Sequence, residues 1–288
     1  MTTATSPITI GAQPSPTSTL VTLARADARR FAMHPLFLFP AVLLLVMMVA
    51  SVAEKNGGGA APMWVTLLIA FLFGVFGFVV AHRLTTSLQR SGDLAETAPV
   101  GARQRTAAMC LACLVPGLAG SVVILFMIVT AALWPPVGVP ATAPVAWFAD
   151  EPDLAILAAL VATGPVAAVG GSLLGVAVAR WAPFRGSALL GMVVLVVGTT
   201  MPSEMSNPWR TLAPWIISAD ETAVDGKVVS SSLVAGISHQ WYLGYVLCLC
   251  GLAVVAALLR DPGNRRPLVW IGAALMLGAA GCFALTVS

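Results

Sequence analysis

Residues 240–259 read QWYLGYVLCLCGLAVVAALL, an apolar stretch that contains no charged side chain. The hydrocarbon core of a bilayer is ~30 Å thick, and ~20 apolar residues in a helix are enough to cross it. The stretch ends at Arg260, the kind of residue that marks a return to the polar surface. We therefore predict a transmembrane helix here rather than a helix buried in a soluble domain.

The rest of the chain repeats this pattern. Charged residues make up only 9% of the 288 positions, whereas a soluble domain carries roughly 25%. The apolar runs also lack the alternation of a membrane β-barrel. We predict an all-α integral membrane protein of about seven transmembrane helices, at 36–53, 63–82, 107–134, 154–179, 186–202, 240–259 and 267–287.

Two of these runs are weaker than the others. Run 186–202 is short and could be tilted or broken at Pro202. Run 267–287 contains several glycines and could instead be a re-entrant or surface-lying segment. Residues 36–288 are expected to form a single membrane domain, with a long polar outer loop at 203–239. Residues 1–19 are rich in Thr, Ser and Pro and are expected to be a disordered cytoplasmic tail, not a cleaved signal.

The basic residues predict the orientation, because cytoplasmic loops are enriched in Lys and Arg. With the N-terminus inside, only Lys55, Arg210 and Lys227 of the 15 basic residues lie outside. The reverse topology would place the other basic residues on the wrong side. We expect a multi-pass protein of a bacterial plasma membrane with a cytoplasmic N-terminus.

The segment before the first span, residues 20–35, is amphipathic. Within LVTLARADARRFAMH (20–34), apolar residues recur every three or four positions, and Arg25, Arg29 and Arg30 lie elsewhere around the helix. Such a helix can lie at the cytoplasmic interface with its arginines at anionic headgroups. The alternative is a plain basic flank that orients the first span. His34-Pro35 is expected to break the helix.

The loop at 84–100 is polar and charged. It follows His82-Arg83 as a short polar helix, is interrupted at Gly92, and contains Arg90, Asp93, Glu96 and Pro99. A charged cytoplasmic segment between two spans suits the docking of a soluble partner. It could equally be an ordinary solvated loop.

These two segments resemble a known family. The arginine-bearing helix that ends in His-Pro, and the loop Arg…Gly-Asp-Leu-Ala-Glu-Thr-Ala-Pro…Arg-Thr-Ala, are similar to those of the type II (ABC-2-like) permeases of bacterial ATP-binding-cassette transporters. The pattern Tyr242…Tyr245…Arg260-Asp261 is similar to the end of the sixth span in that family. Members usually have six spans, so the seventh departs from the pattern.

The resemblance implies roles for the two segments. Residues 20–35 would be the interfacial elbow helix, with Arg25, Arg29 and Arg30. Residues 84–100 would be the coupling loop that seats in a groove of the ATPase subunit, with Arg90, Asp93, Glu96 and Pro99 as partner-binding residues. The expected partners are separate ATP-binding-cassette ATPase subunits, a second permease protomer and membrane lipids, but no nucleic acid.

The sequence also bears on the energy source. It contains no Gly-x-x-x-x-Gly-Lys-Ser/Thr phosphate loop, so it cannot hydrolyse ATP in the P-loop manner. No Asp, Glu, Lys or Arg lies in the middle of a run, which disfavours an ion-driven carrier. We therefore expect an exporter permease that is not itself an enzyme and carries an amphipathic or lipid-like substrate. The alternative is a non-transporting membrane scaffold or assembly subunit.

We predict no catalytic residue, cofactor site or metal site. Cys110 and Cys113 have the spacing of metal or redox pairs, but no second pair or histidine accompanies them, which favours small packing residues. Gly171 and Gly175 have the spacing of closely approaching helices. They could pack the chain against itself or line a moving or dimeric interface.

Overall fold

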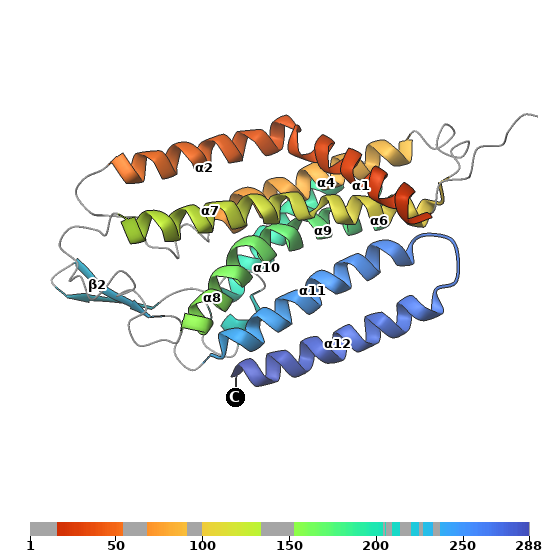
Figure 1. Ribbon diagram of the computed structural model, residues 1–288. Helices are drawn as coiled ribbons and strands as arrows, with labels where there is room; N and C mark the ends of the chain where they lie inside the picture. The colour runs from red at the N-terminus through yellow and green to blue at the C-terminus, as the bar shows by residue number, and fades with distance from the viewer. Residues whose placement is uncertain are drawn as a thin grey trace, which may run out of the picture.

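The computed structural model describes residues 16–53, 68–90, 100–133, 153–203, 205, 209–213, 220–224, 227–232 and 237–287. These residues form a bundle of helices with one small β-hairpin at one end (Figure 1). The elements are α1 (Pro16–Ala32), α2 (Pro35–Ala53), the π-helical η1 (Ala70–Val75), α4 (Phe76–Arg90), α6 (Ala102–Ala112), α7 (Leu114–Leu133), α8 (Asp153–Val161), the π-helical η3 (Ala162–Val166), α9 (Ala167–Trp181), α10 (Ser187–Ser203), the 3-10 helix η4 (Trp209–Leu212), β1 (Asp220–Val224), β2 (Lys227–Ser232), α11 (His239–Leu259) and α12 (Arg266–Val287).

Within the described residues, 5 helices are long and apolar enough to cross a membrane, or up to 6 if α1 and α2 count as one bent span. The five are Ala70–Gln89, Ala102–Phe126, Leu154–Trp181, His239–Leu259 and Arg266–Val287. A membrane protein with several helical spans is therefore the class of fold that the structure supports.

The predicted count of about seven stays a prediction, because this count covers only the described residues. Run 186–202 corresponds to α10, whose 17 residues extend only ~25 Å and fall short of a ~30 Å hydrocarbon core. Run 36–53 corresponds to α2, which qualifies only together with α1, across a bend of 61°. The bend lies at His34-Pro35, where the sequence predicts a break.

Run 267–287 forms one continuous helix, α12. It lies antiparallel beside α11 along its length (Figure 1). A side chain at Gly272 would lie 3.3 Å from Val255 of α11, so the two helices are in close contact. This helical hairpin differs from a re-entrant segment, which would fold back on itself.

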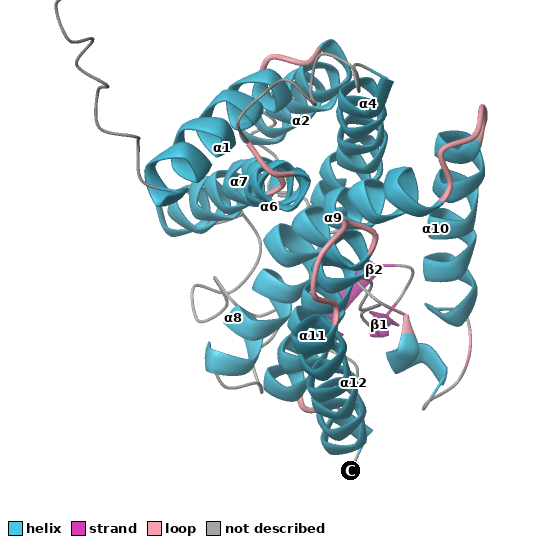
Figure 2. Cartoon of the chain, turned by 90° about the vertical axis from the view of Figure 1, so that its right-hand side faces the viewer, coloured by secondary structure: helices cyan, strands magenta, loops and turns pink. Residues whose placement is uncertain are grey.

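The centre of the bundle is α9, which lies between the α4, α6 and α7 side and the α11–α12 hairpin (Figure 2). Gly171 and Gly175 of α9 face η1 and α4. An added Cβ would lie 2.5 Å from the carbonyl oxygen of Gly74 at Gly171, and 2.3 Å from that of Phe78 at Gly175. These glycines therefore pack the chain against itself, the first of the two alternatives left by the sequence.

The segment 203–239 is more structured than the polar loop that we expected. It contains η4 and the antiparallel pair β1–β2, with Asp220 opposite Ser232 and Val224 opposite Lys227. The dipeptide Asp225-Gly226 between the strands is a strong sequence signal for a hairpin. The strands were missed because the polar residues of this segment suggested a solvated loop.

Tyr242 and Tyr245 of α11 attach this segment to the helix. The Tyr242 hydroxyl donates to the carbonyl of Ala213 at 2.8 Å, and that of Tyr245 to Leu212 at 3.5 Å. The Tyr245 ring also lies 5.8 Å from that of Phe283 on α12. Both tyrosines therefore have a structural role at the hairpin end of the bundle.

Candidate functional site

The candidate site lies at the end of the bundle opposite the β-hairpin, which we call the basic end. Here α4 ends at Arg90, α6 begins at Ala102, α9 ends at Trp181, and residues 260–266 join α11 to α12 (Figure 1). Helix α1 lies against α6 at this end. Helix α1 and the described residues that flank the loop 84–100 therefore belong to this end of the molecule.

Helix α1 has an exposed basic side and a buried apolar side, while its placement at a membrane interface stays a prediction. Arg25, Arg29 and Arg30 are exposed, whereas Phe31 is completely buried. The Phe31 ring packs edge-on against Phe37 of α2, with 5.3 Å between centroids. The helix begins at Pro16, inside the segment that we expected to be a tail, because proline is well tolerated in the first turn of a helix.

The single acidic residue of α1 is buried. Asp27 lies 3.7 Å from the guanidinium of Arg30. Burial raises the pKa of the Asp27 carboxyl, and the charge of Arg30 partly offsets that effect. The outward face of α1 therefore keeps a net positive charge.

The break between α1 and α2 is held by hydrogen bonds. The backbone N–H of Leu36 donates to Nδ1 of His34 at 3.2 Å, and that of Phe37 to the His34 carbonyl at 2.8 Å. Burial and the nearby Arg83 lower the pKa of His34. The neutral form of His34, whose Nδ1 accepts the Leu36 hydrogen bond, is therefore favoured. The effect of Arg83 also shows that α4 lies near the bend.

The loop at 84–100 is described only at its two ends. Residues 84–90 continue α4 as a polar helix, as expected, and the hydroxyls of Thr85 and Ser87 donate to carbonyls of the same helix at 2.8 Å. Arg90 is the last residue of α4. Asp93, Glu96 and Pro99 lie outside the described residues.

The far end of this loop is attached to the rest of the basic end. Arg103, in the first turn of α6, donates from Nη2 to the carbonyl of Asn264 at 3.2 Å. On the other side, Nε2 of Gln89 donates to the carbonyl of Ala179 at 3.5 Å. The residues flanking the loop therefore contact both the end of α9 and the connection between α11 and α12.

A cluster that the sequence analysis did not identify lies next to this attachment. Asp261 is 0% exposed and forms an ion pair with Arg180 at the end of α9. The indole N–H of Trp181 donates to the carbonyl of Ala256 at 2.8 Å, and the Arg260 guanidinium lies 5.8 Å from the centre of the Trp181 ring. These contacts fix the end of α9 to the end of α11.

The ion pair of Arg180 and Asp261 stabilises the contact between α9 and α11 at the basic end. An isolated carboxylate in an apolar interior is costly unless a cation and hydrogen bonds compensate it, so Asp261 depends on Arg180. No sequence spacing reveals this pair, because its members lie 81 positions apart and meet only through the packing of α9 on α11. The one usable signal was a lone aspartate between Arg260 and Arg265-Arg266.

The described residues offer no metal site, since no three of their His, Cys, Asp or Glu side chains converge. Cys110 and Cys113 are buried and free, on α6 and at its end. Both side chains belong to the hydrophobic core of the bundle. Comparison with protein-family models, curated proteins and solved structures gives no match, so the function must be inferred from the residues of this chain.

Proposed function

We propose that this chain is the membrane-spanning permease subunit of an ATP-binding-cassette exporter. In this proposal, a second permease protomer completes the translocation pathway, and separate ATPase subunits dock at the loop 84–100. The location would be a bacterial plasma membrane, with the N-terminus and the basic end in the cytoplasm. The ATPase would meet the loop through Arg90, Asp93, Glu96 and Pro99.

The observation that carries the proposal is the convergence of three segments at the basic end. Helix α1, with its exposed Arg25, Arg29 and Arg30, packs on α6, which begins two residues after the loop 84–100. Arg103 of α6 bonds in turn to Asn264, next to the buried pair of Arg180 and Asp261. A force applied to the loop would therefore pass directly to α6, α1, α9 and the α11–α12 hairpin.

The positions of the charged residues on the helices agree with energy supplied by a separate ATPase subunit rather than by a coupled ion. Within the described part of the five long apolar helices, the arginines lie at the basic end: Arg83 near the end of α4, Arg103 and Arg105 at the start of α6, Arg180 at the end of α9 and Arg266 at the start of α12. A coupling ion would need an ionisable partner deeper in the membrane. With no phosphate loop in the sequence, ATP hydrolysis would have to come from another subunit.

The cargo class follows from the same composition. A pathway between two protomers would be lined by apolar helices with few fixed charges, which suits an amphipathic or lipid-like substrate. A small ionic substrate would need polar groups to replace its hydration shell. The helices of this chain provide few such groups.

The direct test is purification of the full-length chain from its native membrane under mild conditions. The proposal predicts co-purification of an ATP-binding-cassette ATPase, and ATPase activity that is lost when that subunit is removed. Purification without any ATPase would favour the alternative, a non-transporting scaffold or assembly subunit. ATP hydrolysis by the isolated chain would contradict both.

A further inference from the structure

The connection between α11 and α12, residues 260–266, is a short turn with a defined shape, which we call the basic turn. Its sequence is Arg-Asp-Pro-Gly-Asn-Arg-Arg. Gly263 has a φ of +131°, a conformation that side chains rarely adopt. The side-chain oxygen of Asn264 accepts the backbone N–H of Arg266 at 3.1 Å and so starts α12. The backbone of the turn therefore has a defined conformation, which sets the positions from which its arginines extend.

Within the described part of the chain, the positive charge on the surface of the basic turn has no compensating carboxylate. Arg260, Arg265 and Arg266 are exposed, whereas Asp261 is fully buried and committed to Arg180. The other acidic residue described at this end, Asp27, is paired with Arg30 on α1. Among the described residues, no carboxylate is left to neutralise the three guanidinium groups of the turn.

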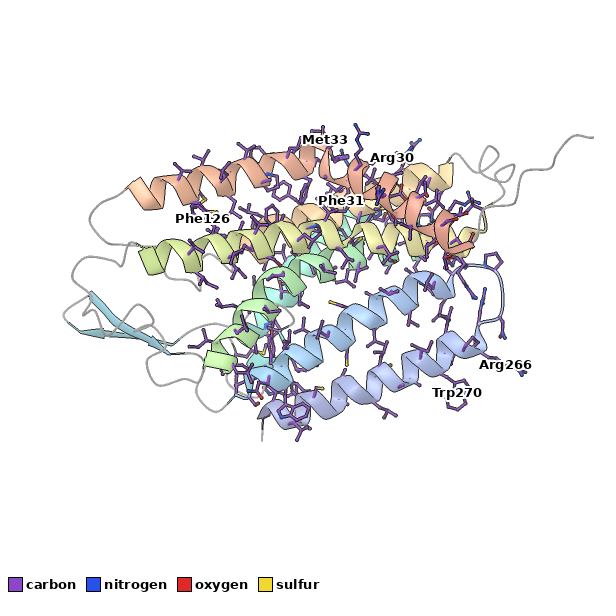
Figure 3. All side chains as sticks on the ribbon, in the orientation of Figure 1. Arg30, Phe31, Met33, Phe126, Arg266 and Trp270 are labelled. Carbon is purple, nitrogen blue, oxygen red and sulfur yellow. The ribbon has the colours of Figure 1, made fainter. Side chains whose placement is uncertain are left out.

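Two exposed tryptophans flank these arginines. Trp270 is 76% exposed and lies one helical turn after Arg266, and Figure 3 shows both side chains pointing away from α11. Trp181 is 56% exposed and lies beneath Arg260. Tryptophan favours the boundary between an apolar region and polar headgroups, because its ring is apolar while its N–H is polar.

The tryptophans continue into an apolar surface. On α12, Val269, Ile271, Met276 and Leu277 are all exposed. From the turn along the helix, the arginines are followed by exposed aliphatic side chains and a tryptophan. A soluble acidic protein would match the arginines but would leave this aliphatic surface uncovered. A phospholipid matches both, with its phosphate at the arginines and its acyl chains along α12.

We propose that the basic turn, with Trp181 and Trp270, is a binding site for the headgroup of an anionic phospholipid. Basic groups between membrane helices on the cytoplasmic side bind such headgroups in other proteins. The phosphate lies among Arg260, Arg265 and Arg266. This site does not depend on whether the chain is a transporter.

The test uses the purified full-length protein in zwitterionic detergent micelles, titrated with phosphatidylglycerol and observed by native mass spectrometry. The variant Arg265→Gln/Arg266→Gln should raise the apparent dissociation constant by about 25-fold, or about fivefold per arginine. Arg265→Lys/Arg266→Lys keeps the charge and should retain most of the binding. Because these side chains are exposed, the thermal midpoint in phosphatidylcholine should be unchanged in both variants.

The matched control is Arg83→Gln/Arg185→Gln, which removes the same charge from two other exposed arginines, on α4 and in the connection after α9. The proposal predicts little loss of tightly retained phosphatidylglycerol in that variant. An equal loss of phosphatidylglycerol binding in both double Gln variants would indicate a general charge effect and would overturn the site. Unchanged phosphatidylglycerol binding by Arg265→Gln/Arg266→Gln would overturn it as well. Displacement of the lipid by millimolar inorganic phosphate would point to a free anion instead and would also overturn it.

Discussion

Arg180, at the end of α9, pairs with the fully buried carboxylate of Asp261 in the turn after α11. The pair joins the central helix of the bundle to the α11–α12 hairpin at the end where the loop 84–100 begins and ends. Its removal should therefore affect both the stability of the fold and the mechanical connection proposed for transport.

Replacing Asp261 with Asn should lower the free energy of unfolding by about 3 kcal/mol, because the Arg180 guanidinium would be left partly buried without its counter-charge. The measurement is thermal or denaturant unfolding of the purified protein in detergent. Arg180→Gln should cost a similar amount.

The double variant Asp261→Asn/Arg180→Gln provides the control for this pair. Because the two side chains interact directly, the double variant should be less destabilised than the sum of the two single variants, by about 1–3 kcal/mol. Additive effects would show that the pair contributes no coupling and that the end of α9 is held by other contacts.

Gly175→Ala should destabilise the bundle by about 1–3 kcal/mol. The new Cβ would lie 2.3 Å from the backbone oxygen of Phe78, so α4 and α9 would have to separate. Gly198→Ala in α10 is the matched control, since nothing lies within 4 Å of its added Cβ. That control should be neutral or stabilising, because alanine favours a helix over glycine by about 1 kcal/mol.

Thermal unfolding of both glycine variants distinguishes packing of Gly175 within the chain from a contact of Gly175 with a second protomer. If Gly175→Ala leaves the midpoint unchanged but weakens self-association, the glycine belongs to a contact between two protomers. That outcome would contradict the packing of α9 on α4.

The sequence predicts best those helices whose apolar run is bounded by polar or charged residues at both ends. The predicted helix 240–259 agrees with α11 (His239–Leu259) to within one residue. Polar residues before the apolar run, and Arg260 after it, define both ends of the helix. The fourth apolar run contains Pro165, which the structure accommodates in the π-helical turn η3. Proline removes one backbone donor, and a wider turn is one way to absorb that loss.

Other features depend on tertiary contacts and could not be predicted. The pair of Arg180 and Asp261, and the bond from Arg103 to Asn264, exist only once α6, α9 and the basic turn are brought together. The role of Gly171 and Gly175 was also undecided, because a close approach of helices has the same spacing within a chain as between chains. The assignment of Asp93, Glu96 and Pro99 as docking residues stays a prediction.

Reporter fusions should place positions 95 and 263 in the cytoplasm, and positions 145 and 220 outside. The distribution of arginines sets this expectation, because translocation of basic loops is disfavoured. Position 220 lies in β1, at the end of the bundle opposite the basic turn. An external signal at position 95 would exclude any contact between the loop 84–100 and a cytoplasmic ATPase.

The most direct test of the proposed function is charge reversal in the loop 84–100. The carboxylate of Glu96 is expected to meet a basic residue of the ATPase at a partly shielded contact, where removal of one partner costs about 2–5 kcal/mol. Glu96→Arg adds repulsion and should weaken ATPase binding at least 30-fold, the lower end of that range, since each ~1.4 kcal/mol is tenfold.

Glu221→Arg provides the matched control, since it makes the same substitution in β1 at the opposite end of the bundle. The measurement is the amount of ATPase that co-purifies with each variant at equal membrane levels, together with export of the cargo. The account predicts that Glu96→Arg loses both ATPase and export while Glu221→Arg keeps both. Wild-type ATPase binding and export by Glu96→Arg would contradict it and would leave the loop as a simple solvated connection.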